Sequence, residues 1–341
     1  MSANPIYHLK DSYFFEVPKG IWRQGWKTLD EVPLFLRNGS PEIHDVAAFN
    51  HALDGKILIP QPFAELESLY AVKSGFGLSK YMLLELLIAG LMLLIFTWVA
   101  SRLRSGAAPK GPLLNLFESM LLFIRDNIAR PAIDEHGHEH DNDSNGDDHH
   151  TSHAGGPARA HAAVHTGDRF VPLLWTLFFF VLGCNLMGMV PWAGSPTASF
   201  SVTLALAGVT FATVVVAGML KFGFFGFFGN QVPSMDLPLP IAIVLKPMIF
   251  AIEILGLGIK HMILAVRLLA NMVAGHLVLL GIMGMISAAA SYSMGMWATV
   301  TGISVVSSAL FSLLELFVAF LQAYIFTFLS ALFIGASVHQ H

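Results

Sequence analysis

The chain has 341 residues, of which 55% are hydrophobic and only 12% are charged, and its mean hydropathy is +0.63. Soluble domains carry about 25% charged residues, so the composition excludes an ordinary soluble protein and predicts an integral membrane protein. The single cysteine, Cys184, excludes a disulfide framework and is expected to be a small core residue. The net charge of −4 says little about partners, because the charges are concentrated in two regions. We expect no nucleic-acid partner.

Residues 1–75 hold many charges and prolines, which predicts an extramembrane segment that packs loosely or folds against partners. The first membrane span is expected from Tyr81 to Ala100, because about 20 apolar residues cross about 30 Å of hydrocarbon. The basic residues that follow it are Arg102, Arg104 and Lys110. By the positive-inside rule this loop faces the cytoplasm, which puts the N-terminus outside.

From Pro112 to Arg130 the apolar positions predict a short amphipathic helix that lies on the membrane. Residues 76–130 are therefore expected to hold the first span and this helix. Residues 131–168 carry eight histidines and many acidic residues, and predict a disordered cytoplasmic loop. The loop is read either as a solvated insertion or as a metal-binding His/Asp cluster, although its spacing defines no closed tetrahedral site.

Residues 169–338 are expected to form an ion-translocating helical domain. The stretch 170–220 has no charged residue and predicts two spans joined by an outer turn at 191–196, and residues 222–232 predict a loop. The apolar stretch 239–291 is too long for one perpendicular span, so it predicts either a hairpin or a long tilted helix. A last apolar block covers 297–338. The fold class is thus all-α, with about five membrane-crossing helices and the C-terminus inside.

One arginine, Arg267, lies deep in the stretch 239–291. A guanidinium stays protonated, and placing it near the bilayer centre costs about 2.5–3.5 kcal/mol or more. No acid lies three or four residues away, so the charge is expected to serve an ion path. At 100° per residue, Glu253, Lys260 and Asn271 share its face within about 40°, whereas His276 points the opposite way.

The last block carries Glu315 and Gln322 on one face. A buried carboxylate needs a partner or must be protonated, and an imidazole near neutrality can relay protons. The opposed directions of the two helices make the pairs His276–Glu315 and Arg267–Gln322 compatible in depth. Two neighbours have simpler interpretations: Asn271 could be an interhelical hydrogen-bonding residue, and His261, next to Lys260, is expected at the membrane interface.

Several of these residues belong to motifs that follow one another along the chain in the same order as in a known protein family. They are the run Arg267–His276, the segments Ser105–Gly111, Asn185–Pro191 and Pro196–Ala207, and Glu315 followed by Leu321–Tyr324. Over about residues 75–335 the chain resembles subunit a of the F-type ATP synthases, the proton-channel stator of the membrane sector. The sequence departs from the family pattern in Gly188, where some members carry Asp, and in Ser199 and Ser201, where Asp and Asn often occur.

The resemblance implies that Arg267 meets the ion-binding carboxylate of a rotating c ring and keeps two half-channels apart. Asn271 and Gln322 would support that site, and His276 and Glu315 would line the outer half-channel. Some members carry the acid and the histidine in swapped positions. Glu253, Lys260, Asn185 and Ser199 are further candidates for supporting roles. The two long helices would form a tilted hairpin against the ring.

The expected partners are the c ring, the peripheral-stalk b subunits, the catalytic head through the complex, and the lipid bilayer. We expect no cofactor and no metal, and no catalysis by the chain itself, because it lacks a phosphate-binding Gly-Lys-Ser/Thr loop. A bacterial plasma membrane is the expected location. Two alternatives are a proton-coupled secondary transporter or antiporter subunit, which predicts internal repeats, and a structural subunit of a respiratory complex.

Overall fold

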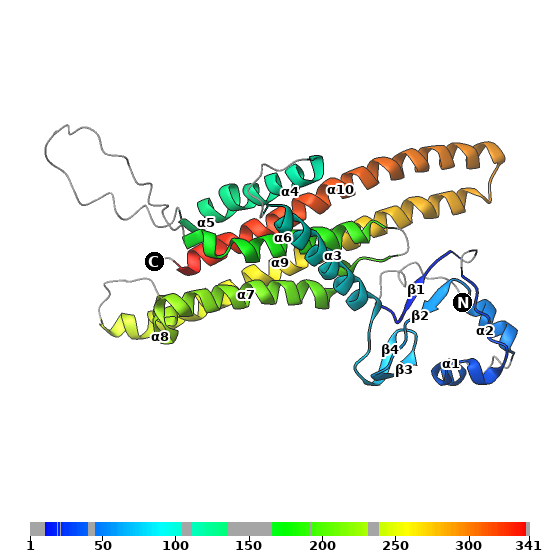
Figure 1. The fold of residues 1–341 in the computed structure, drawn as a ribbon, viewed down its shortest axis with the longest axis horizontal. Helices are drawn as coiled ribbons and strands as arrows, with labels where there is room; N and C mark the ends of the chain where they lie inside the picture. The colour runs from blue at the N-terminus through cyan, green and yellow to red at the C-terminus, as the bar shows by residue number, and fades with distance from the viewer. Residues whose placement is uncertain are drawn as a thin grey trace. The chain divides into compact units, whose positions relative to one another are not determined.

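Helices dominate the computed structural model, which describes residues 11–18, 20, 22–39, 45–103, 111–134, 166–190, 193–230 and 239–338. Within these residues, five helices are long and apolar enough to cross a membrane. They are α3 (Lys80–Leu103), α6 (Val171–Gly188), α7 (Phe200–Phe222), α9 (Leu239–Ala289) and α10 (Met294–Val338), labelled in Figure 1. The prediction of an all-α membrane protein with about five crossing helices is therefore confirmed.

The last two helices are unusually long. α9 has 51 residues and α10 has 45, so at about 1.5 Å per residue each is more than twice as long as the hydrocarbon core is thick. The sequence was compatible with either a hairpin or one long helix for residues 239–291. The structure shows one helix, which continues through Pro247. Residues 290–293 then turn the chain into α10, so α9 and α10 form a helical hairpin (Figure 1).

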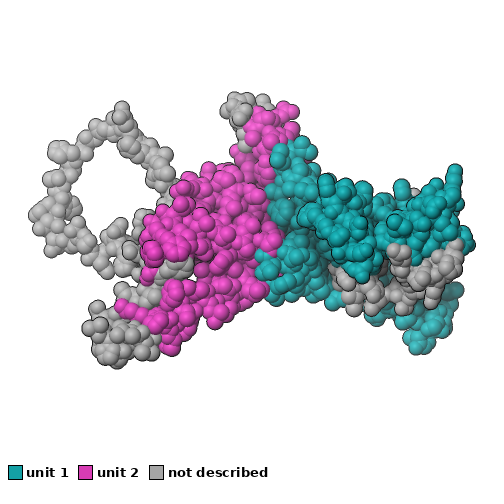
Figure 2. Space-filling view, turned by 90° about the horizontal axis from the view of Figure 1, so that it is seen from below, with its two compact units in different colours: residues 1–95, 180–204, 266–321 teal, residues 96–179, 205–265, 322–341 magenta. Residues whose placement is uncertain are grey.

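The chain divides into two compact units (Figure 2). Unit 1 comprises residues 1–95, 180–204 and 266–321, and unit 2 comprises residues 96–179, 205–265 and 322–341. Each boundary falls inside one of the five long helices, so every candidate span contributes to both units.

The N-terminal part of unit 1 contains strands, which the sequence did not predict. β1 (Phe14–Glu16) pairs antiparallel with β2 (Lys56–Leu58), and β3 (Ala64–Ser68) pairs with β4 (Ala71–Gly75). The 3₁₀ turn η2 (Leu29–Glu31) and the short helices α1 (Leu34–Gly39) and α2 (Val46–Ala52) lie between β1 and β2 in the chain. Each strand has only three to five residues, which is too short for a clear alternation of apolar and polar positions.

This N-terminal part has a small core of its own. Phe14, Val32 and Phe49 are each at most 3% exposed. The backbone N–H of Lys80, at the start of α3, donates to the carbonyl of Ser12 over 2.8 Å. The segment is therefore attached to the beginning of the first span through a backbone hydrogen bond as well as through the chain.

Unit 2 holds the predicted amphipathic helix as α4 (Pro112–Phe123), followed without a break by the π-helical turn η3 (Ile124–Ala129) and by α5 (Arg130–Asp134). The helical run ends four residues later than the predicted end at Arg130. Residues 135–165 of the predicted loop lie outside the described residues. The prediction of a loop at 222–232 is wrong for α8 (Phe224–Asn230), whose Phe227 is buried.

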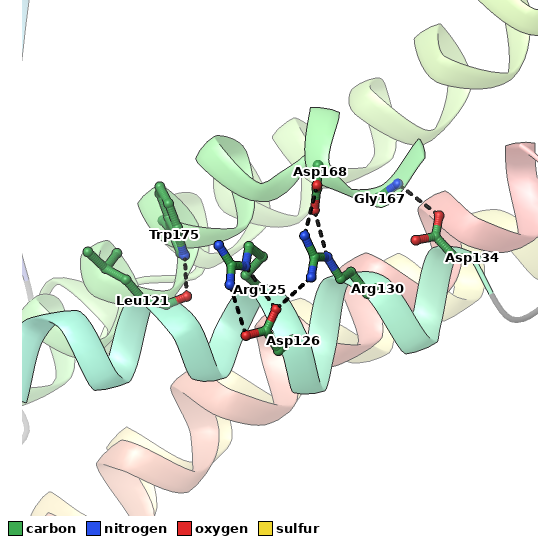
Figure 3. A network of polar contacts seen from close by, with 8 residues as sticks. All are labelled: Leu121, Arg125, Asp126, Arg130, Asp134, Gly167, Asp168 and Trp175. Carbon is green, nitrogen blue, oxygen red and sulfur yellow. Dashed lines mark hydrogen bonds and ion pairs between the residues drawn. The ribbon is translucent and has the colours of Figure 1, made fainter. Parts of the chain in front are cut away.

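A polar cluster joins α5 to η5 (Thr166–Arg169), the 3₁₀ turn before α6 (Figure 3). The Arg130 guanidinium donates to both carboxylate oxygens of Asp168, over 2.9 and 3.0 Å, and to Asp126 over 3.0 Å. Asp134 accepts from the backbone N–H of Gly167 over 3.0 Å. The hydrogen bond from Arg125 holds the pKa of Asp126 below its usual value. Residues 134 and 166 are thus held close together.

Candidate ion-translocation site

Arg267 lies just past the middle of α9, deep in the apolar stretch where the sequence placed it. Its side chain is half-buried, and no hydrogen bond or ion pair links it to another residue in the described part of the chain. Ile263, one turn earlier, is 51% exposed, and Ala270, nearly one turn later, is also exposed. The guanidinium therefore lies at the edge of an open apolar helix face, where an acid from another chain can reach it.

His276 and Glu315 come together in unit 1, one from each arm of the α9–α10 hairpin. Nδ1 of His276 lies 3.8 Å from Oε1 of Glu315, so the predicted contact is confirmed. Glu315 is 8% exposed, and its Oε1 has no hydrogen-bond partner among the described residues. A distance of 3.8 Å is too long for a direct hydrogen bond. A small side-chain movement would allow one to form, and one water molecule could bridge the two groups.

The imidazole of His276 also faces two backbone carbonyls. Nδ1 lies 2.9 Å from the oxygen of Met272, one turn earlier, and Nε2 lies 3.1 Å from the oxygen of Gly188. Gly188 is the last residue of α6, where a carbonyl has no partner within the helix. A neutral ring has one N–H, so it satisfies both carbonyls only while it carries two protons. A neutral His276 therefore donates to one of the two carbonyls at a time.

Glycine at 275 makes room for the carboxylate of Glu315. A Cβ atom built on Gly275 would lie 2.5 Å from Oε1 of Glu315 and 3.1 Å from its Cδ. Glycine at 188 similarly makes room for the loop after α6, because a Cβ there would lie 2.6 Å from Oγ of Ser195. A longer side chain at this position would not fit without moving Ser195.

Asn185 holds the elements around this pair together. It is fully buried on α6, its Oδ1 accepts a 3.0 Å hydrogen bond from Thr197, and its Nδ2 donates to the carbonyl of Ala319 over 3.3 Å. Thr197 belongs to the 3₁₀ turn η6 (Pro196–Ala198) before α7, and Ala319 lies one turn beyond Glu315 on α10. Asn185 thus positions the helix that carries the carboxylate.

The other candidates are more dispersed. Glu253 and Asn271 are half-buried on α9, and Lys260 is exposed. Gln322 is buried on α10, and its Nε2 lacks a hydrogen-bond partner among the described residues. Ser199 is hydrogen-bonded to Ser201 over 2.8 Å. The pairing of Arg267 with Gln322 stays a prediction.

His261 is buried between helices, and its expected position at the membrane interface stays a prediction. The residue is 4% exposed, and its ring packs against Phe211 and Phe333, with centroids 5.2 and 5.0 Å away. Its Nδ1 lies 2.9 Å from the carbonyl of Leu257. The neighbouring Lys260 had suggested a position at the membrane interface. The burial of His261 comes from side chains of α7 and α10 that pack against this face of α9.

Sequence reasoning also missed the carbonyl of Gly188 and the space at Gly275. A backbone carbonyl carries no residue-type signal, so nothing in the sequence pointed to Gly188 as a partner of His276. Gly275 did carry a signal, because a glycine inside a helix is costly and indicates close packing when it is kept.

Five candidate spans with a histidine and a glutamate paired between two of them define a polytopic helical membrane protein that has ionisable groups inside its spans. Residues 158–335 match the family model described as ATP synthase A chain. The chain belongs to this family.

Relatives named ATP synthase subunit a support the assignment over most of the chain. The relative from Anaeromyxobacter sp. (strain Fw109-5) is 32% identical over 100% of this chain and 71% of its own length. The relative from Chlorobium phaeobacteroides is 32% identical over 89% of this chain and 78% of its own. The relative from Myxococcus xanthus is 37% identical over 74% of this chain and 70% of its own. None of these names favours a secondary transporter.

Proposed function

We propose that the chain forms two proton half-channels at the interface with a rotating c ring, and that it couples proton flow to rotation and ATP synthesis. The observation that carries the proposal is Arg267: a permanent cation inside a span, with no acidic partner in the described part of its own chain. Such a cation is costly in hydrocarbon. An approaching carboxylate from the ring would offset that cost.

The outer half-channel ends at His276 and Glu315. In this proposal a proton passes between the His276 imidazole and the Glu315 carboxylate. The carbonyls of Met272 and Gly188 hold the imidazole in place between transfers. Ser199 and Asn185 lie on the segments that lead to the pair. Glu315 then hands the proton to the ring carboxylate.

Arg267 separates this path from the inner half-channel. Its charge favours the ionised form of the ring carboxylate, so the carboxylate releases its proton there and cannot pass the site protonated. Moving one charge through the membrane potential is worth about 2.3 kcal/mol per 100 mV, and a direct leak past Arg267 would dissipate it. Asn271 and Gln322 would orient the guanidinium, while Glu253 and Lys260 would line the inner side.

The partners proposed for the chain are the c ring, the peripheral-stalk b subunits and, through the complex, the catalytic head. We place it in a bacterial plasma membrane with the N-terminus outside and the C-terminus in the cytoplasm. The bacterial sources of the relatives and the basic residues after α3 support this placement.

The test is proton-driven ATP synthesis in vesicles that contain the complete complex. Arg267→Ala and Arg267→Lys should both abolish synthesis, since lysine is a compact charge that can lose its proton and cannot present a planar fork. Lys246→Gln is the matched control, because it removes an exposed cation from the same helix. Normal coupled synthesis in Arg267→Ala would reject the proposal.

A further inference from the structure

Unit 2 contains a cleft of about 240 Å³ where α6 begins and where α7 and α10 end. These three helix termini lie at the same end of unit 2 in Figure 1. Arg169 and Phe170 line the cleft from the start of α6, Val216 and Lys221 line it from α7, and Val338 lines it from α10. The cleft contains none of the residues assigned to proton transfer.

The two basic residues of the cleft have no acidic partner in the part of the chain that the structure describes. Arg169 and Lys221 are both exposed, and neither side chain forms a hydrogen bond or ion pair with a described residue. The nearest acid along the chain, Asp168, already accepts hydrogen bonds from Nε and Nη2 of Arg130. The ammonium of Lys221 lies 5.7 Å from the ring centroid of Phe222. Among the described residues, the two positive charges of the cleft are therefore left without an acidic partner.

The remaining walls are apolar. Leu220 is 73% exposed and Val216 is 53% exposed on α7, while Ala217 and Val338 form a buried floor. These residues belong to the last turns of candidate spans. At the end of a span, such side chains lie where acyl chains meet the headgroup layer. A soluble anion would leave this apolar surface uncovered, whereas a lipid would cover it.

We propose that this cleft binds an anionic phospholipid, with the phosphate between Arg169 and Lys221 and an acyl chain along Val216 and Leu220. Basic pockets between transmembrane helices on the cytoplasmic side are suited to anionic headgroups. The proposal is independent of the proton path, because it needs only that the chain spans a membrane.

The test uses the complete complex in nanodiscs of phosphatidylcholine that contain a minor fraction of phosphatidylglycerol. Bound phospholipid is identified by native mass spectrometry after detergent release. Each cation near the membrane surface adds about fivefold in affinity, so Arg169→Gln or Lys221→Gln should weaken retention of phosphatidylglycerol about fivefold, and the double variant about thirtyfold. Lys246→Gln, an exposed cation outside the cleft, should leave retention unchanged.

Two further arms test the position and the ligand class. Val216→Trp keeps both charges but fills the half-exposed wall of the cleft, and should also reduce retention of phosphatidylglycerol. Inorganic phosphate should not displace the lipid. The proposal is overturned if the double variant and Lys246→Gln retain equal amounts of phosphatidylglycerol. It is also overturned if phosphatidylcholine is retained as strongly as phosphatidylglycerol, or if inorganic phosphate displaces the lipid.

Discussion

Glu315→Gln is the sharpest probe of the outer half-channel. Nδ1 of His276 and Oε1 of Glu315 lie 3.8 Å apart. With both groups ionised and an effective dielectric constant of about 20, their attraction is about 4 kcal/mol, or about a thousandfold in an equilibrium constant. Glutamine has nearly the same shape but carries neither the charge nor a transferable proton. Proton-driven ATP synthesis is therefore expected to fall by roughly two to three orders of magnitude, while the complex still assembles.

The assay is ATP synthesis in vesicles under an imposed proton gradient, with subunit content measured on the same preparation. Glu85→Gln is the matched control, because Glu85 also lies in a span and its Oε1 also lacks a hydrogen-bond partner among the described residues. The swapped variant His276→Glu with Glu315→His should recover part of the activity, since it restores one imidazole and one carboxylate. Full activity of Glu315→Gln, or equal loss in Glu85→Gln, would refute the reasoning.

Two further predictions concern residues around these sites. Gly275→Ala should push the Glu315 carboxylate away from α9, because the new methyl would lie 2.5 Å from Oε1; proton-driven synthesis should fall without loss of assembly, and adding Glu315→Asp should restore part of it. Unchanged synthesis in Gly275→Ala would show that the close approach is unimportant. Arg130→Ala should speed amide hydrogen exchange at Gly167, whereas Arg125→Ala should not, because Arg125 is hydrogen-bonded only to the adjacent Asp126 among the described residues. Equal exchange in the two variants would contradict the role of Arg130 in joining α5 to η5.

The sequence predicted the five long helices because each shows a long apolar run, which is a strong local signal. It could not decide between a hairpin and one helix for 239–291, since an apolar run longer than the bilayer suits both. The strands β1 to β4 were missed because three to five residues show too little periodicity. The helix α8 was read as a loop because its two glycines disfavour a helix in isolation.

The contact between His276 and Glu315 could be predicted because helical angle and depth along two antiparallel helices follow from the residue numbers alone. The burial of His261 could not, because it depends on Phe211 and Phe333, which come from two other helices. The same limit applies to Asn185, whose hydrogen bonds reach Thr197 and the backbone of Ala319. The spacing of residues along one helix predicts the direction of each side chain, but the partner of that side chain depends on the neighbouring helices.

The central claim is that Arg267 prevents protons from crossing without rotation. The most direct measurement is passive proton flow through the membrane sector after the ring carboxylates have been blocked with a carbodiimide, so that the ring cannot carry protons. With Arg267 present the blocked sector should not conduct, whereas the blocked Arg267→Ala sector should leak protons between the half-channels. Absence of any leak in blocked Arg267→Ala, in a preparation with intact c ring and stalk, would contradict the account.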